Sequence, residues 1–122
     1  MKRKLYYIDD DKQNLEVFRL LFAGDYEVMA FSNANLFLQE IDDHDIEVLF
    51  VDFKMPTMSG LDLIRQVKQS YPKAVCLLLS GYVEPAIMSD PLVDGFVRKP
   101  YDIEKLFTQI ADAFKAYDQK AD

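Results

Sequence analysis

Hydrophobic residues along this chain follow two alternating patterns. Short uninterrupted apolar runs are typical of strands buried in a parallel sheet, whereas an apolar residue at every third or fourth position is typical of a helix that buries one face. The run at 48–51 is the clearest strand, because it ends abruptly at Asp52 and a loop with Pro56 follows it. Strands are predicted at 5–8, 26–31, 48–51, 74–79 and 96–98.

The helical stretches have recognisable beginnings and ends. A side-chain oxygen just before a helix can accept a hydrogen bond from a free backbone N–H, and this role is predicted for Asp11, for Ser32 or Asn33, and for Asp102. Gly24 and Pro72 mark the ends of two helices. The predicted apolar faces consist of Leu15, Phe18, Leu21 and Phe22; Ala34, Phe37, Leu38 and Ile41; Leu61, Ile64, Val67 and Tyr71; and Ile103, Leu106, Phe107, Ile110 and Phe114.

The segment 81–94 departs from this regularity. Pro85 is compatible with a first helical turn, but Pro91 ends any helix six residues later. A helix of fewer than two turns is marginal on its own. We therefore predict that the fourth helix is shortened or irregular.

Strands and helices alternate along the whole chain. This order predicts an α/β domain, a doubly wound five-stranded parallel sheet with helices on both faces. Each crossover between parallel strands is expected to be right-handed. With 122 residues, we expect a single domain that spans residues 1–122.

Charge and cysteine content narrow the class of protein. Fourteen Lys and Arg residues stand against 21 Asp and Glu residues, and this net charge of -7 disfavours nucleic acid or an anionic membrane as a direct partner. Cys76 lies in an apolar run and is predicted to be a buried free thiol, as in a reducing compartment. The basic N-terminus precedes no apolar segment, so we expect no signal peptide, no membrane span and a cytoplasmic location.

Polar residues follow four of the predicted strands, at the edge where open α/β sheets place their active sites. Asp9 and Asp10 follow the first strand, Asp52 the third, Ser80 the fourth and Lys99 the fifth. Carboxylates brought together repel one another unless a cation lies between them, and Mg²⁺ is a hard cation that prefers oxygen ligands. A metal ion, the ammonium group of Lys99 and the hydroxyl of Ser80 would together suit a phosphoryl group on an aspartate nucleophile.

Each of these residues also has an ordinary structural interpretation. An aspartate after a strand is often a loop residue or a helix cap, and Asp11 is better explained as a cap than as a ligand. His44, in an acidic loop, is interpreted as a surface residue, and Tyr6 and Tyr7 as packing residues. The order of the polar residues along the chain is more specific than any one of them.

Four motifs together resemble the receiver domain of bacterial two-component response regulators. They are Ile8-Asp9-Asp10-Asp11, Val51-Asp52-Phe53-Lys54-Met55-Pro56 with Gly60 beyond it, Leu79-Ser80-Gly81, and Arg98-Lys99-Pro100. The resemblance covers essentially the whole chain. It implies a CheY-like, flavodoxin-like fold with strand order 2-1-3-4-5.

The resemblance also implies a role for each acid. Asp52 would accept a phosphoryl group from a phosphohistidine on a histidine kinase or a histidine phosphotransfer protein, with Mg²⁺ as the cofactor. Asp10 and Asp52 would bind the metal directly together with the backbone carbonyl of Lys54. Asp9 would act largely through water.

The remaining motif residues would respond to phosphorylation. Lys99 would pair with the phosphoryl oxygens, and Ser80 would move to hydrogen-bond one of them. Phe96 matches the aromatic switch residue, which turns inward as the hydroxyl moves. The Lys99-Pro100 peptide bond is expected to be cis.

Two features depart from the usual receiver pattern. The stretch from Ser80 to Lys99 is short and contains two prolines, which places the usual mode of dimerisation in doubt. Lys54 and Tyr82 occupy positions that tune the lifetime of the phosphoryl group in the family. A bulky pair there would screen Asp52 from water, so slow autodephosphorylation is expected.

The function implied is a phosphorelay signalling switch that takes part in its own phosphoryl transfer and is not a turnover enzyme. The rival interpretation is a receiver-like module for constitutive protein interaction that is never phosphorylated. A magnesium-dependent phosphatase usually has a second acid two residues after its nucleophile, where this chain has Lys54, so we set that interpretation aside. The cognate kinase, the downstream target or output domain, and a homodimer are left open.

Overall fold

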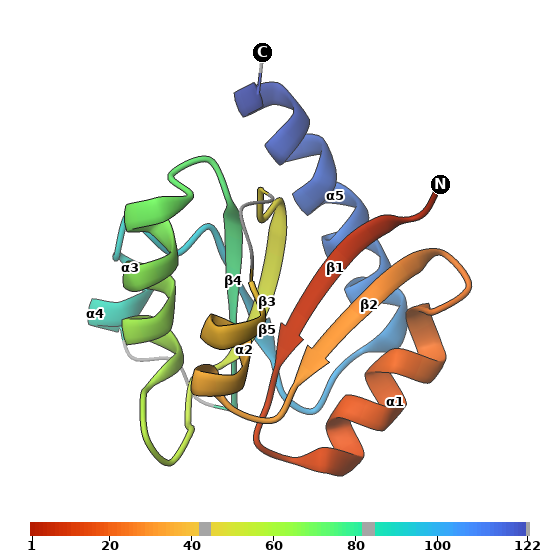
Figure 1. Cartoon of the computed structure of the whole chain (residues 1–122), viewed down its shortest axis with the longest axis horizontal. Coiled ribbons are helices and arrows are strands. Elements are labelled where there is room, and N and C mark those ends of the chain that lie inside the picture. The colour runs from red at the N-terminus through yellow and green to blue at the C-terminus, as the bar shows by residue number, and fades with distance from the viewer. Residues whose placement is uncertain (42–44, 82–84, 122) are drawn as a thin grey trace.

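The computed structural model describes residues 1–41, 45–81 and 85–121, and strands and helices alternate along them (Figure 1). The strands are β1 (Arg3–Ile8), β2 (Tyr26–Phe31), β3 (Val48–Asp52), β4 (Val75–Ser80) and β5 (Gly95–Arg98). The helices are α1 (Lys12–Phe22), α2 (Ala34–Glu40), α3 (Gly60–Ser70), α4 (Pro85–Met88) and α5 (Ile103–Ala121).

The strands form one parallel sheet, as the alternation of patterns predicted, in the order β2-β1-β3-β4-β5 that the resemblance implied. Strand β3 lies at the centre, and all five of its residues are buried. In the register of the sheet, Ile8 pairs with Val51 and Asp52 pairs with Leu79. The carboxyl ends of β1, β3 and β4 therefore reach the same edge of the sheet side by side.

Two layers of helices cover the sheet, so the doubly wound α/β fold is confirmed (Figure 1). Helices α1 and α5 pack on one face, where Phe18, Phe22 and Ile110 join the buried cluster. Helices α2 and α3 pack on the other face, where Phe37 and Ile64 contribute. Alternate residues of β3 point into the two clusters, because successive side chains of a strand face opposite sides.

The helix caps follow the predicted chemistry. The carboxylate of Asp11 accepts hydrogen bonds from the backbone N–H groups of Gln13 and Asn14. Of the two candidates for the second cap, Asn33 occupies the position, and its side chain accepts from the N–H of Leu36 at 2.8 Å. The Asp102 side chain accepts from the N–H of the residue three positions on, which places it at the start of α5.

Some predicted boundaries differ slightly from the observed ones. Strand β1 begins two residues before Leu5, and β4 runs one residue further than predicted, to Ser80. Ile41 follows α2 with extended backbone and does not belong to its helical face. His44 and Tyr82, which carried predictions from the sequence, lie outside the described residues.

The shortened fourth helix is confirmed. Helix α4 has four residues, begins at Pro85, and has no fully buried side chain, although Ile87 is half-buried. It ends at Met88, before Pro91 is reached, because the backbone N–H of Asp90 bonds to the carbonyl of Ile87 and not to that of Ala86. Among the described helices, none combines the length and the apolar composition that crossing a membrane would require.

Gly60 lets α3 start against the end of β3. Its N–H donates to the carbonyl of Phe53 at 2.9 Å. A Cβ atom at this position would stand 2.4 Å from the backbone oxygen of Asp52 and 2.8 Å from Cδ1 of Leu78. Only glycine permits this approach, so Gly60 fixes the distance between the helix and the strand that carries Asp52.

We predict that Gly60→Ala lowers the free energy of unfolding by about 1–3 kcal/mol, because the backbone of β3 cannot move aside without disturbing the sheet. Chemical denaturation measures the change. Gly24→Ala is the matched control: nothing lies within 4 Å of the added methyl group, and the backbone there is compatible with alanine. The control should retain or slightly gain stability, and equal stability of Gly60→Ala and the unaltered chain would contradict the packing described here.

Candidate functional site

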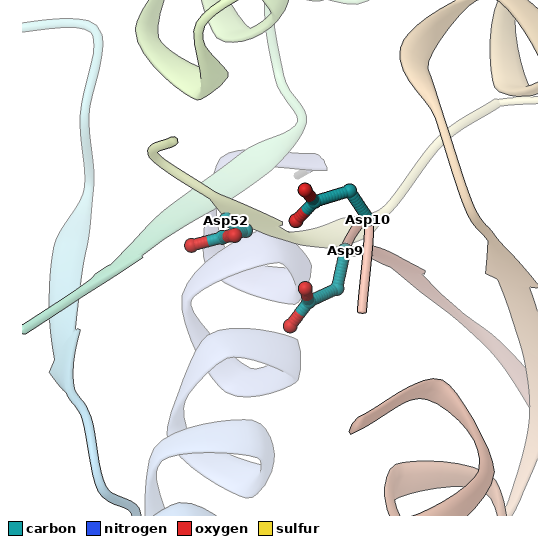
Figure 2. A group of neighbouring side chains, drawn as sticks. All are labelled: Asp9, Asp10 and Asp52. Atoms are coloured by element: carbon teal, nitrogen blue, oxygen red, sulfur yellow. The ribbon is translucent and has the colours of Figure 1, made fainter. Parts of the chain in front are cut away.

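Three carboxylates meet at the carboxyl edge of the sheet. Asp9 and Asp10 directly follow β1, and Asp52 is the last residue of β3. Figure 2 shows the three side chains close to one another, and one oxygen from each lies within 4.8 Å of the others. Asp9 and Asp52 are buried, whereas Asp10 is exposed. The parallel register of β1 and β3 brings about this convergence, because it ends the two strands at the same level.

Asp9 is fully buried and is held by hydrogen bonds. Its Oδ2 accepts from the Tyr7 hydroxyl at 2.7 Å and from the Asn14 amide at 3.2 Å, and its Oδ1 accepts from the N–H of Asp11 at 3.0 Å. A buried carboxylate needs such partners, since an unpaired charge in a low-dielectric interior is strongly unfavourable.

Lys99 joins two of the acids. Its ammonium nitrogen lies 3.1 Å from Oδ2 of Asp9 and 3.2 Å from Oδ1 of Asp52. Burial tends to lower the pKa of Lys99, but the charges of Asp9 and Asp52 outweigh this effect and raise it. The Lys99-Pro100 peptide bond is cis, and the N–H of Lys99 donates to the carbonyl of Ser80 at 3.0 Å, which aligns the ends of β4 and β5.

Burial raises the pKa of the Asp52 carboxyl to about 6. This net value includes the neighbouring charge of Asp9, which also raises the pKa, and the contact with Lys99, which lowers it. One ammonium group therefore does not fully compensate the negative charge at this edge of the sheet. A divalent cation among the three carboxylates would remove the remaining repulsion, and carboxylate oxygens are the ligands that hard cations such as Mg²⁺ prefer. The donor set thus fits a metal site.

The other predicted site residues surround this cluster at different depths. Ser80 is buried at the end of β4. Phe96 on β5 is half-buried and packs against the hydrophobic cluster beneath α2 and α3. Lys54 is exposed in the loop after β3. Beside Asp10, an open pocket of about 540 Å³ extends between the start of α2 and Pro56 and leaves the Asp10 carboxylate accessible from outside.

Sequence reasoning missed two tyrosines of this site. Tyr7 does pack as predicted, with its ring stacked on Phe18 at 4.0 Å between centroids, but its hydroxyl also donates to Asp9. Tyr101, which follows Pro100, makes a short hydrogen bond with the Tyr7 hydroxyl. One signal was available for Tyr7: residues two apart on a strand share a face, so its hydroxyl lies on the side of Asp9.

Comparison with known proteins places this geometry in a family. The family model of the response regulator receiver domain matches residues 5–111. The response regulator protein TodT of Pseudomonas putida is 31% identical over 120 residues, which cover 95% of this chain and 53% of TodT. The chain thus spans about half the length of that relative.

Solved structures show the same fold at lower identity. A CheY-like receiver domain protein from Methanospirillum hungatei has a TM-score of 0.89 and 20% identity, over 98% of this chain and 99% of that one. The chemotaxis protein CheY4 of Vibrio cholerae has a TM-score of 0.84 and 19% identity, over 93% of this chain and 99% of that one.

The family match extends over most of the chain, including the strands that carry the three acids and Lys99. The identity to TodT supports the same assignment. The chain therefore belongs to the response regulator receiver domains, whose standard function is that of a phosphoacceptor switch in two-component signalling.

Proposed function

We propose that Asp52 is the residue that accepts the phosphoryl group in this domain. The observation that carries the proposal is the position of Lys99, whose ammonium group lies 3.2 Å from the buried Asp52 carboxylate. In the transfer, an Asp52 oxygen forms a bond to phosphorus while the bond from phosphorus to the donor nitrogen breaks. Lys99 is placed to pair with the oxygens of the transferred group, where negative charge gathers.

The metal ligands proposed here are those that the resemblance to receiver domains implies. Asp10 and Asp52 would bind Mg²⁺ directly, and the backbone carbonyl of Lys54 would complete the protein ligands. The metal supplies positive charge that neutralises the acids and the oxygens of the arriving phosphoryl group. The exposed face of Asp10 and the adjoining pocket support this assignment, because the cation and a phosphodonor need access from solvent.

Asp9 would act on the metal through water. Four donors already engage its two oxygens: the Tyr7 hydroxyl, the Asn14 amide, the Asp11 N–H and the Lys99 ammonium. A direct bond to a cation would have to displace or crowd these donors. Its role would therefore be to anchor Lys99 and to add negative charge to the site that holds the metal.

Phosphorylation would change the surface that a partner contacts. In this proposal Ser80 moves toward the phosphoryl oxygens and Phe96 turns inward, so new charge on Asp52 biases a two-state surface. The response regulator relatives imply a histidine kinase as partner, and a histidine phosphotransfer protein would present the same phosphohistidine.

The domain acts as a switch and not as a turnover enzyme. We further propose that residues 1–122 form one receiver domain, and the buried free thiol of Cys76 supports a cytoplasmic location.

A receiver-like module that only binds proteins is the alternative function. Such a module has no use for buried acids that repel one another, and the charge of Asp9 contributes, after burial, to the raised pKa of Asp52. The cluster therefore favours the phosphorylated switch.

Incubation with Mg²⁺ and acetyl phosphate should add one phosphoryl group to the protein, and Asp52→Asn should abolish the addition because the nucleophilic oxygen is lost. Intact-protein mass spectrometry measures both. Asp112→Asn, which removes an exposed carboxylate on α5, is the matched control and should be phosphorylated normally. Labelling of Asp52→Asn at the normal level would place the acceptor elsewhere.

The affinity for Mg²⁺ should fall as the pH drops through about 6, the pKa of Asp52, because a protonated carboxyl does not bind the metal. Below this pH the affinity should fall roughly tenfold per unit. The raised pKa also affects stability in the absence of metal. The protonated Asp52 carboxyl contributes to the free energy of unfolding at low pH, and this contribution is lost as the pH rises through about 6. Calorimetric titrations with Mg²⁺ from pH 5 to pH 8 measure the affinity, and a Mg²⁺ affinity independent of pH would argue against Asp52 as a ligand.

The phosphorylated domain should lose its phosphoryl group slowly, with a half-life well beyond seconds. Lys54 belongs to the loop that follows Asp52, and its long side chain would help screen the phosphoryl group from attacking water. Lys54→Ala should then shorten the half-life, with Lys73→Ala, an exposed lysine between α3 and β4, as the control. The decay of the phosphorylated mass after removal of the phosphodonor gives the lifetime, and decay within seconds in the unaltered domain would contradict the screening.

A further inference from the structure

Two tyrosine hydroxyls extend the hydrogen-bond network of Asp9. Tyr7 is fully buried, and its ring is stacked on Phe18 with an interplanar angle of 2°, so its hydroxyl has a fixed position. That hydroxyl lies 2.7 Å from Oδ2 of Asp9 and also contacts the hydroxyl of Tyr101. The two residues are 94 positions apart in the chain. Together they connect the acid after β1 to the loop that precedes α5.

The direction of the hydrogen bonds follows from counting protons. A neutral tyrosine has one proton to donate. The charged Asp9 carboxylate is a stronger acceptor than a phenol, so Tyr7 donates to Asp9. The oxygen of Tyr7 then accepts the proton of Tyr101. Burial raises the pKa of both phenols, that of Tyr101 to about 12, so both retain their protons at neutral pH.

This arrangement matters when Lys99 changes partner. At present Oδ2 of Asp9 accepts from Lys99, Tyr7 and Asn14. A phosphoryl group on Asp52 would draw the ammonium group away from Asp9, and the fully buried Asp9 carboxylate would lose its only positively charged donor among the described contacts. The Tyr7 hydroxyl, polarised by Tyr101, is the shortest of the described hydrogen bonds that would remain on Oδ2.

We propose that Tyr7 and Tyr101 are positioning residues that stabilise the Asp9 carboxylate, so that Lys99 can leave Asp9 for the phosphoryl group on Asp52. The inference rests on the proposed function, and it adds a residue pair that tunes the phosphorylated state. Neither tyrosine contacts the predicted metal ligands Asp10 and Asp52 through a described hydrogen bond. Removal of their hydroxyls should therefore affect the phosphoryl group more than the metal.

Beryllofluoride, which binds an aspartate as a mimic of the phosphoryl group, provides the test. With saturating Mg²⁺, Tyr7→Phe should weaken beryllofluoride binding roughly tenfold, because a hydrogen bond to a charged group is lost in the state where Asp9 most needs it. Tyr101→Phe should weaken it in the same direction but less. The affinity for Mg²⁺ alone should change less than about twofold in both. Fluorine-19 NMR and calorimetry measure the two affinities.

The substitutions keep the aromatic rings, so stacking on Phe18 and the fold should persist. Tyr26→Phe is the control, because Tyr26 stacks on Phe114 and its strand β2 lies at the edge of the sheet away from Lys99. Unchanged beryllofluoride binding in both variants, or equal losses of beryllofluoride and Mg²⁺ affinity, would overturn the inference, since equal losses indicate general distortion. If the unaltered domain bound neither ligand, the proposed function itself would fail. If Tyr7→Phe did not fold, Tyr101→Phe would decide the matter, because Tyr101 is only half-buried.

Discussion

Repulsion among three carboxylates is the constraint on which the rest of this domain depends. Asp9, Asp10 and Asp52 are gathered at one edge of the sheet although like charges in a poorly solvated place oppose one another. The pKa of the Asp52 carboxyl is raised to about 6, mainly because the group is buried, and the charge of Asp9 adds to this effect. Such a cluster persists only because the buried strands behind it stabilise the fold by far more than the cluster destabilises it. The unfavourable charge is then available to bind a cation and to respond to an added anion.

The sheet provides the rigidity that this arrangement requires. Strand β3 is buried along its whole length, and its neighbours β1 and β4 lie in parallel register, so Asp52 cannot withdraw from Asp9 without disrupting pairs on both sides. Gly60 then brings the start of α3 against the same strand end. Lys99 reaches the acids from the far side because the N–H of Lys99 bonds to Ser80 at the end of β4. Backbone contacts thus position each charged group independently of the charges themselves.

Much of this architecture was predictable because it depends on local patterns. Buried parallel strands give uninterrupted apolar runs, and the order of polar residues after them indicated which side chains converge. The choice between Ser32 and Asn33 as a cap required coordinates, because both side chains suit that position. The pairing of Tyr7 with Tyr101 was beyond local reasoning, since it depends on how the loop after β5 returns across β1. Strand periodicity places Tyr7 on the face of Asp9, but it does not indicate that the Tyr7 hydroxyl meets Tyr101.

The short α4 has a consequence for how such a domain can diversify. No side chain of this single turn is fully buried, although Ile87 is half-buried and packs against the hydrophobic cluster beneath α2 and α3. The other positions of the turn can therefore vary without leaving a cavity in the core. Most substitutions at exposed positions change stability little, so foldability constrains this stretch only weakly. Selection is then free to shape it for recognition, and related domains in one cell could acquire distinct targets here while the charged edge of the sheet stays the same.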